Sequence, residues 1–160
     1  MKGRILIKNE KLEKAYRLIN VDLPCPTSCL ICESHGFLFL PKEMEYLSRK
    51  VEIHRKKFAK CYRLGKYKIW ARLQKDEDCP FFQNGRCINR EARPLDCRSY
   101  PAIPTLKNGK LKVTLSKRCP LVINRKIPAD FLKRALKAWK IVSPPKWWLK
   151  LYQIWIEKSK

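Results

Sequence analysis

Residues 79–98 read CPFFQNGRCINREARPLDCR, and this stretch decides how we expect the chain to fold. Its Asn84-Gly85 pair is a tight-turn signal, which predicts a hairpin with Cys79 and Cys87 on opposite sides of its mouth. Cys97 follows a short stretch with a helical pattern. Because these three thiols can converge, the sequence predicts a fold organised around cysteine side chains.

Five more cysteines lie outside that stretch. The segment CPTSCLIC, residues 25–32, holds three thiols too close together for disulfides among them, but a loop can wrap all three around one metal centre. Disulfides stay an alternative only for a chain from hyperthermophile cytosol, because other cytosols keep thiols reduced. Thiolates so placed suit an iron–sulfur cluster or tetrahedral zinc. The candidate metal ligands are Cys25, Cys29, Cys32, Cys79, Cys87, Cys97 and Cys119, with Cys61 as an additional candidate.

The number of metal sites stays open. Eight thiols satisfy one four-iron cluster plus a zinc, or two four-ligand sites, and the sequence does not assign the pairs.

Composition bounds the class of protein. The 160 residues suit one domain with its own core, since 45% of them are hydrophobic. No apolar run approaches the ~20 residues of a membrane span. The first eight residues lack the sustained apolar region of a signal peptide, so we expect a cytoplasmic protein. All five glycines are isolated, which excludes a glycine-rich phosphate or dinucleotide loop.

The chain is strongly basic, with 37 Lys+Arg against 14 Asp+Glu and a net charge of +23. Six of the eight cysteines lie in or at the edges of two windows, 21–40 and 76–97, where acidic residues outnumber basic ones. A cationic exterior around a cysteine-bearing centre attracts polyanions, so we expect an acidic partner, with RNA or the ribosome favoured. The alternative is a solvated lysine surface, although this charge exceeds what solubility needs.

Apolar periodicity predicts mostly helices. The expected elements are helices over 9–19, 41–60, 129–141 and 146–160, a half-buried strand over 66–74, a strand starting at 5–7 and a hairpin over 103–115. The expected fold class is mainly α with one or two short β-hairpins, in a small single domain organised around a Cys-ligated metal centre.

The chain is expected to divide in two. Residues 1–125 would form the cysteine-cluster metal-binding domain, and 126–160 a basic, Trp-rich C-terminal helical segment packing on it. We expect Trp147, Trp148 and Trp155 to dock as core. The alternatives are stacking on nucleic-acid bases or lying at a membrane surface.

The order of the cysteine motifs resembles the YkgJ-type cysteine-cluster family, whose members are described as zinc- or iron-chelating and are related to flagellin lysine N-methylases. The matching elements, over about residues 25–120, are Cys25, Cys29 and Cys32, then Cys79-Pro80-Phe81, Gly85-Arg86-Cys87, Arg93-Pro94-Leu95-Asp96-Cys97-Arg98, and Cys119. The resemblance implies iron–sulfur or zinc binding and, with the number of cysteines, favours a 4Fe-4S cluster over zinc. Glu33 stands where the family has a fourth opening cysteine, so Cys61 and His35 are the candidate replacements for that ligand.

Two functional classes stay open, and no catalytic residue is assigned in either. The first is a binding module whose cationic surface engages an acidic partner. The second is an iron–sulfur-dependent modifying enzyme, linked to protein lysine methylation or to S-adenosylmethionine through the C-x3-C-x2-C spacing. Radical S-adenosylmethionine enzymes need most of a β/α barrel, about 200 residues or more. Conventional methyltransferase domains need a glycine-rich loop. The sequence therefore favours the binding module.

Overall fold

The computed structural model describes residues 9–20, 23–25, 36–52, 54–72, 79–84 and 86–158. The expected strand at 5–7 lies outside these ranges. So do four residues of the predicted metal site and its turn: Cys29, Cys32, His35 and Gly85. Glu33, which takes the place of the family's fourth opening cysteine, lies outside them as well.

Three long helices match the apolar periodicity of the sequence. They are α1 (Asn9–Leu18), α7 (Phe131–Val142) and α8 (Lys146–Lys158), and they confirm the predictions at 9–19, 129–141 and 146–160 within a few residues. Four shorter helices complete the helical part of the described chain: α3 (Glu43–Lys50), α4 (Arg55–Phe58), α5 (Leu95–Ser99) and α6 (Pro120–Ile123).

Strands form three small antiparallel sheets in the described ranges. The first has the order β1–β3–β2, from β1 (Phe37–Leu38), β2 (Lys60–Leu64) and β3 (Tyr67–Arg72). The second is the hairpin of β4 (Phe82–Gln83) and β5 (Arg86–Cys87). The third joins β6 (Ala102–Lys107) to β7 (Lys110–Leu115) with Leu106 opposite Leu111, which confirms the predicted hairpin at 103–115.

The prediction of a mainly α fold is wrong, because the described chain is mixed α/β with seven helices and three antiparallel sheets. The helix expected over 41–60 is the main source of the error. It ends at Lys50, Glu52 takes a left-handed φ of 51°, and the chain restarts as the short α4 before entering β2. Phe58 keeps helical spacing with Met44 and Leu47 in the sequence, yet it is buried from a different element.

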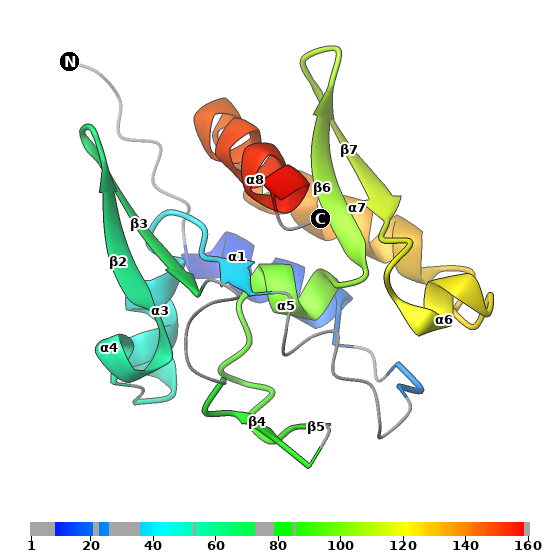
Figure 1. The fold of residues 1–160 in the computed structure, drawn as a ribbon, viewed down its shortest axis with the longest axis horizontal. Coiled ribbons are helices and arrows are strands. Elements are labelled where there is room, and N and C mark those ends of the chain that lie inside the picture. The colour runs from blue at the N-terminus through cyan, green and yellow to red at the C-terminus, as the bar shows by residue number, and fades with distance from the viewer. Residues whose placement is uncertain are drawn as a thin grey trace.

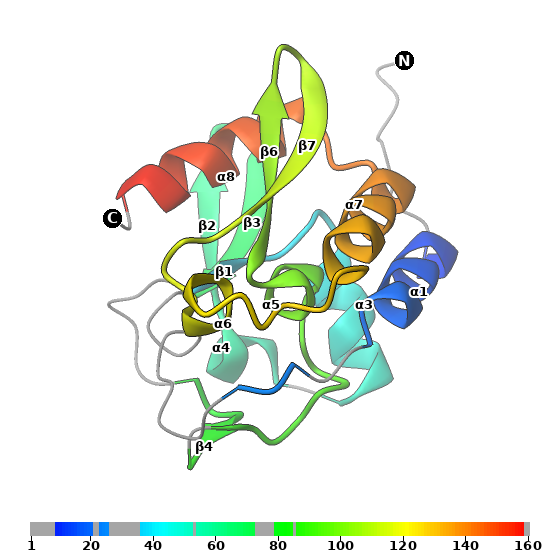
Figure 2. The same cartoon turned by 90° about the vertical axis from the view of Figure 1, so that its right-hand side faces the viewer.

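The core lies where α1, α7 and α8 meet the strands (Figures 1 and 2). In both views α1 and α7 lie side by side, and α8 packs along β6. Trp148 is fully buried, and its Nε1–H donates a hydrogen bond of 2.9 Å to the Phe39 carbonyl. Its ring stacks on Tyr152 with centroids 5.0 Å apart. Trp148 therefore docks as core, as the sequence predicted.

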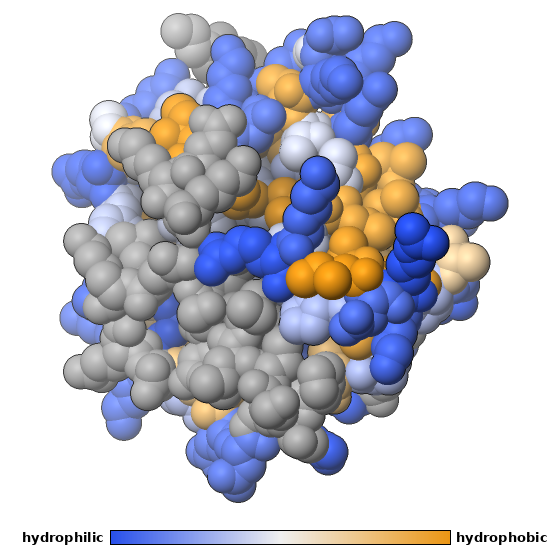
Figure 3. All heavy atoms as spheres, turned by 45° about the vertical axis from the view of Figure 1, so that its right-hand side comes forward, coloured by the Kyte–Doolittle hydropathy of each residue, from blue (hydrophilic) through white to orange (hydrophobic). Residues whose placement is uncertain are grey.

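The surface is mixed. On the face in Figure 3, an apolar area drawn in orange is bordered by hydrophilic side chains in blue. Ile123 and Ile154 are 65% and 51% exposed, so some large aliphatic side chains face solvent. None of the helices in the described ranges combines the length and hydropathy that a bilayer crossing requires.

Candidate metal centre

The β4–β5 hairpin brings two of the predicted ligands together. Phe82 lies opposite Cys87 in the ladder, and Asn84 adopts the left-handed φ of 50° that the turn requires. The Phe82 N–H donates to the Cys79 carbonyl at 2.9 Å, and the Ile88 N–H donates to the Phe81 carbonyl at 2.7 Å. Cys79 and Cys87 therefore flank the open end of the hairpin, as the Asn84-Gly85 turn predicted.

The two thiols are close enough to interact electrostatically. Burial raises the pKa of the Cys79 thiol above its ordinary value, and a charge on Cys87 raises that pKa further. The nearby Arg72 guanidinium and backbone N–H groups lower it. Arg72 is itself buried and donates from Nη1 to the Phe58 carbonyl at 3.0 Å. A bound metal cation would attract both thiolates and so offset the repulsion between them. Thiolate-ligated metal sites are stabilised in this way.

An aromatic contact fixes the hairpin to the core. Phe81, beside Cys79, packs edge-to-face on the buried Phe58 with ring centroids 4.9 Å apart. The thiol of Cys87 donates to the Asn89 carbonyl at 3.5 Å, within the hydrogen-bond range of sulfur. The two candidate ligands are thus held by packing beside Cys79 and by a backbone contact at Cys87.

Two side chains next to Cys97, those of Asp96 and Arg98, hold this segment in place through hydrogen bonds. Asp96 is buried and accepts hydrogen bonds from the Leu38 N–H at 3.1 Å and the Tyr152 hydroxyl at 2.5 Å. Burial raises the pKa of Asp96 to about 7. The partners of Asp96 are thus a backbone N–H and a tyrosine hydroxyl.

The Arg98 side chain donates hydrogen bonds to backbone carbonyls. Its Nε donates to the Arg93 carbonyl at 2.8 Å, and its Nη2 donates to the carbonyls of Arg90 and Glu91 at 3.0 and 3.1 Å. Its guanidinium also lies over the Tyr16 ring, 4.2 Å from the centroid. The Arg-Pro-Leu-Asp-Cys-Arg motif therefore fixes the position of α5, which carries Cys97.

Glu43 is the buried polar residue that sequence reasoning missed. Its Oε1 accepts from the Tyr16 hydroxyl at 2.7 Å and from the Leu95 N–H at 2.6 Å, and its Oε2 accepts from the Leu40 N–H at 2.9 Å. Burial raises the pKa of this carboxyl, while these hydrogen bonds and Arg98 lower it. An acidic residue after Pro41 is ordinary at a helix start, so the sequence held no signal for its burial.

The other predicted ligands are spread over several elements. Cys25 is exposed, Cys97 is half-buried in α5, and Cys119 is buried at the N-cap of α6. Cys61 is exposed on β2, opposite Trp70. Across the ranges that the structure describes, no group of three or more His, Cys, Asp or Glu side chains could hold a metal ion. The Cys79–Cys87 pair is thus the part of the predicted site that the structure brings together.

Comparison with protein-family models, curated proteins and solved structures finds no match to this chain. The resemblance to the YkgJ-type family therefore stays a prediction from the motifs.

Proposed function

We propose that this chain is a metal-binding cysteine-cluster protein, with Cys79 and Cys87 as two of its thiolate ligands. The observation that carries the proposal is the hairpin mouth, where two cysteines interact electrostatically beside a buried arginine. Iron–sulfur clusters and structural zinc both take ligands from such paired cysteines. The donor set therefore fits a thiolate-ligated metal.

The remaining ligands would come from the other cysteines near this end of the molecule. Residues 23–25, α5 and α6 lie in the same lower half of Figures 1 and 2 as β4–β5. Cys25, Cys97 and Cys119 are therefore the described candidates, and Cys29 and Cys32 continue the first segment along the chain. A 4Fe-4S cluster is favoured over zinc because of the number of cysteines and the resemblance of the motifs. When bound, a cluster would supply electron transfer or substrate activation, whereas zinc would be structural.

The second half of the proposal is an acidic partner, with RNA or the ribosome favoured, met in the cytoplasm. A net charge of +23 supports it, because such a field concentrates polyanions at the surface. Metal and partner would act together as in a binding module, in which the metal stabilises the fold that presents the charged surface.

Anaerobic purification tests the metal directly. The expected product is a brown protein with about four irons and matching sulfide per chain, in the stoichiometry of a 4Fe-4S cluster. A colourless protein with one or two zincs per chain would support the zinc alternative. A protein with neither metal would contradict the proposal.

Cysteine variants locate the site. Cys79→Ser and Cys87→Ser should each lower the metal content and the thermal midpoint, because a thiolate ligand is lost. Cys61→Ser tests the additional candidate ligand, which is exposed on β2. Full metal content in both hairpin variants would remove these residues from the site. Metal loss in Cys61→Ser would add Cys61 to the ligands.

A further inference from the structure

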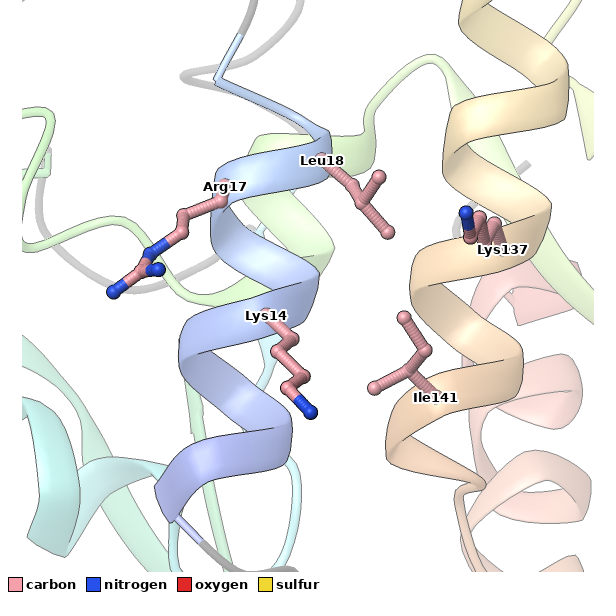
Figure 4. A pocket seen from close by; sticks show the side chains of 5 residues that line it. All are labelled: Lys14, Arg17, Leu18, Lys137 and Ile141. Carbon is pink, nitrogen blue, oxygen red and sulfur yellow. The ribbon is translucent and has the colours of Figure 1, made fainter.

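A shallow, open groove of about 340 Å³ lies between α1 and α7 and is lined by three cationic and two aliphatic side chains. Figure 4 shows the two helices antiparallel, with Lys14 facing Ile141 and Leu18 facing Lys137 across the gap. Arg17 extends over the outer side of α1. We call these five residues the α1–α7 patch. Its apolar part is limited to Leu18 and Ile141, and its rim is cationic.

In the described ranges, no ion pair joins Lys14, Arg17 or Lys137 to another residue. Of the acidic side chains near the patch, Glu13 and Asp130 pair with other cations, whereas Glu10 lies one helical turn before Lys14 on α1. Glu13 of α1 binds Lys50 at 2.9 Å, and Asp130 binds Arg134 at 2.5 Å.

The sequence of α7 makes this surface more positive still. Between Phe131 and Val142 it contains no Asp or Glu, and it exposes Lys133, Lys137 and Lys140. Like charges three or four residues apart on a helix repel each other and destabilise the helix. Both Lys14–Arg17 and Lys133–Lys137 have that spacing. An anion bound along the groove would offset this repulsion.

We propose that the α1–α7 patch binds the phosphodiester backbone of single-stranded RNA. This inference rests on the acidic partner of the proposed function and says where that partner docks. Two aliphatic side chains are too few to bury the apolar face of an acidic amphipathic peptide, whereas they suit the sugar edges of a strand whose phosphates meet the lysines. The charge of the groove complements a continuous polyanion rather than a single small acid.

The expected loss of RNA affinity can be calculated from counterion release. For a single strand, each neutralised phosphate contributes a slope of about −0.7 in log K against log salt, or about fourfold in affinity at 150 mM salt. The triple variant Lys14→Gln/Arg17→Gln/Lys137→Gln should therefore bind about 50-fold more weakly and lower the slope by about 2. The matched control is Lys107→Gln/Lys110→Gln/Lys112→Gln, which removes the same charge from exposed lysines of the β6–β7 hairpin.

Fluorescence anisotropy with a labelled oligouridine measures both variants and the unmodified chain over a range of salt concentrations. Circular dichroism establishes that each variant is folded, and the single charge reversal Lys137→Glu gives a milder second variant that should also weaken binding. A loss confined to the α1–α7 variants supports the inference. Equal losses in patch and control would overturn it, because the whole surface would then bind RNA without a preferred site.

Three further outcomes separate this inference from the proposed function. If the unmodified chain binds oligouridine but the patch variants bind it equally well, the patch is excluded while the acidic partner stands. If the unmodified chain binds poly-glutamate through the patch but not oligouridine, the partner is an acidic protein and the RNA assignment is wrong. If it binds neither polyanion, the acidic partner falls as well, while the metal content still tests the cysteines.

Discussion

Replacing Glu43 with glutamine is the sharpest test of how this fold is held together. Both carboxyl oxygens of Glu43 accept backbone N–H groups, from Leu95 on one side and Leu40 on the other. A glutamine has one oxygen, so its NH₂ group must face one of these donors. Each unpaired buried donor costs about 1–3 kcal/mol, and two facing donors should lower the free energy of unfolding by about 2–6 kcal/mol.

Thermal and urea unfolding measure that loss. In a chain of this length 1 kcal/mol corresponds to about 2–4 °C, so the midpoint of Glu43→Gln should fall by about 10 °C. Tyr16→Phe removes only the hydroxyl that donates to Oε1 and should cost about 1 kcal/mol. Glu91→Gln is the matched control, because its side chain is 64% exposed and its contact with Lys50 is 3.7 Å long. If Glu43→Gln unfolds at the same midpoint as Glu91→Gln, the buried carboxylate does not hold α3, β1 and α5 together as argued.

Three further changes test other parts of the structure. Trp148→Phe leaves the buried Phe39 carbonyl unpaired and opens a cavity. The free energy of unfolding, measured with urea, should therefore fall by about 2–4 kcal/mol, and a fall of less than about 1 kcal/mol would contradict the packing of α8. In Arg98→Lys the lysine cannot reach three carbonyls at once, so the change should cost about 1–3 kcal/mol, with faster amide exchange in residues 90–93 than in α5; unchanged exchange in residues 90–93 would contradict the role assigned to Arg98. Burial raises the pKa of Glu43 above 4.5, so the folded chain retains a proton that the unfolded chain releases. Stability should therefore fall as the pH rises from about 4.5 through the folded-state pKa, and the same slope in Glu43→Gln would assign the pH effect to other groups.

Local signals predicted the elements whose structure is decided locally. The Asn-Gly turns predicted β4–β5 and β6–β7, and the apolar stripes of α7 and α8 gave those helices within a few residues. The break after Lys50 has no such signal, because Met44, Leu47 and Phe58 keep helical spacing across it. Those side chains are buried from different elements, and only the assembled core shows this.

The hairpin that carries Cys79 and Cys87 was predictable from the sequence, but the contacts that support the candidate site were not. Cys79 and Cys87 follow from the turn between them. Glu43 and Asp96 are buried carboxyls whose partners, such as Tyr16 and Tyr152, lie 27 and 56 residues away in the chain. Pairings at that separation depend on tertiary packing, and no local pattern encodes them.

The hydrogen bonds that α8 makes with Phe39 and Asp96 can form only late in biosynthesis. The Phe39 carbonyl is synthesised 109 residues before Trp148, whose indole N–H is its hydrogen-bond donor. At 5–20 residues per second, translation of the chain between them takes about 5–20 s. Asp96 is likewise synthesised before Tyr152, whose hydroxyl donates to its carboxyl group. Until α8 leaves the ribosome, the nascent chain exposes an apolar surface with two unsatisfied acceptors at its centre. The chain is therefore more exposed to proteases and to aggregation before α8 emerges than after α8 has packed.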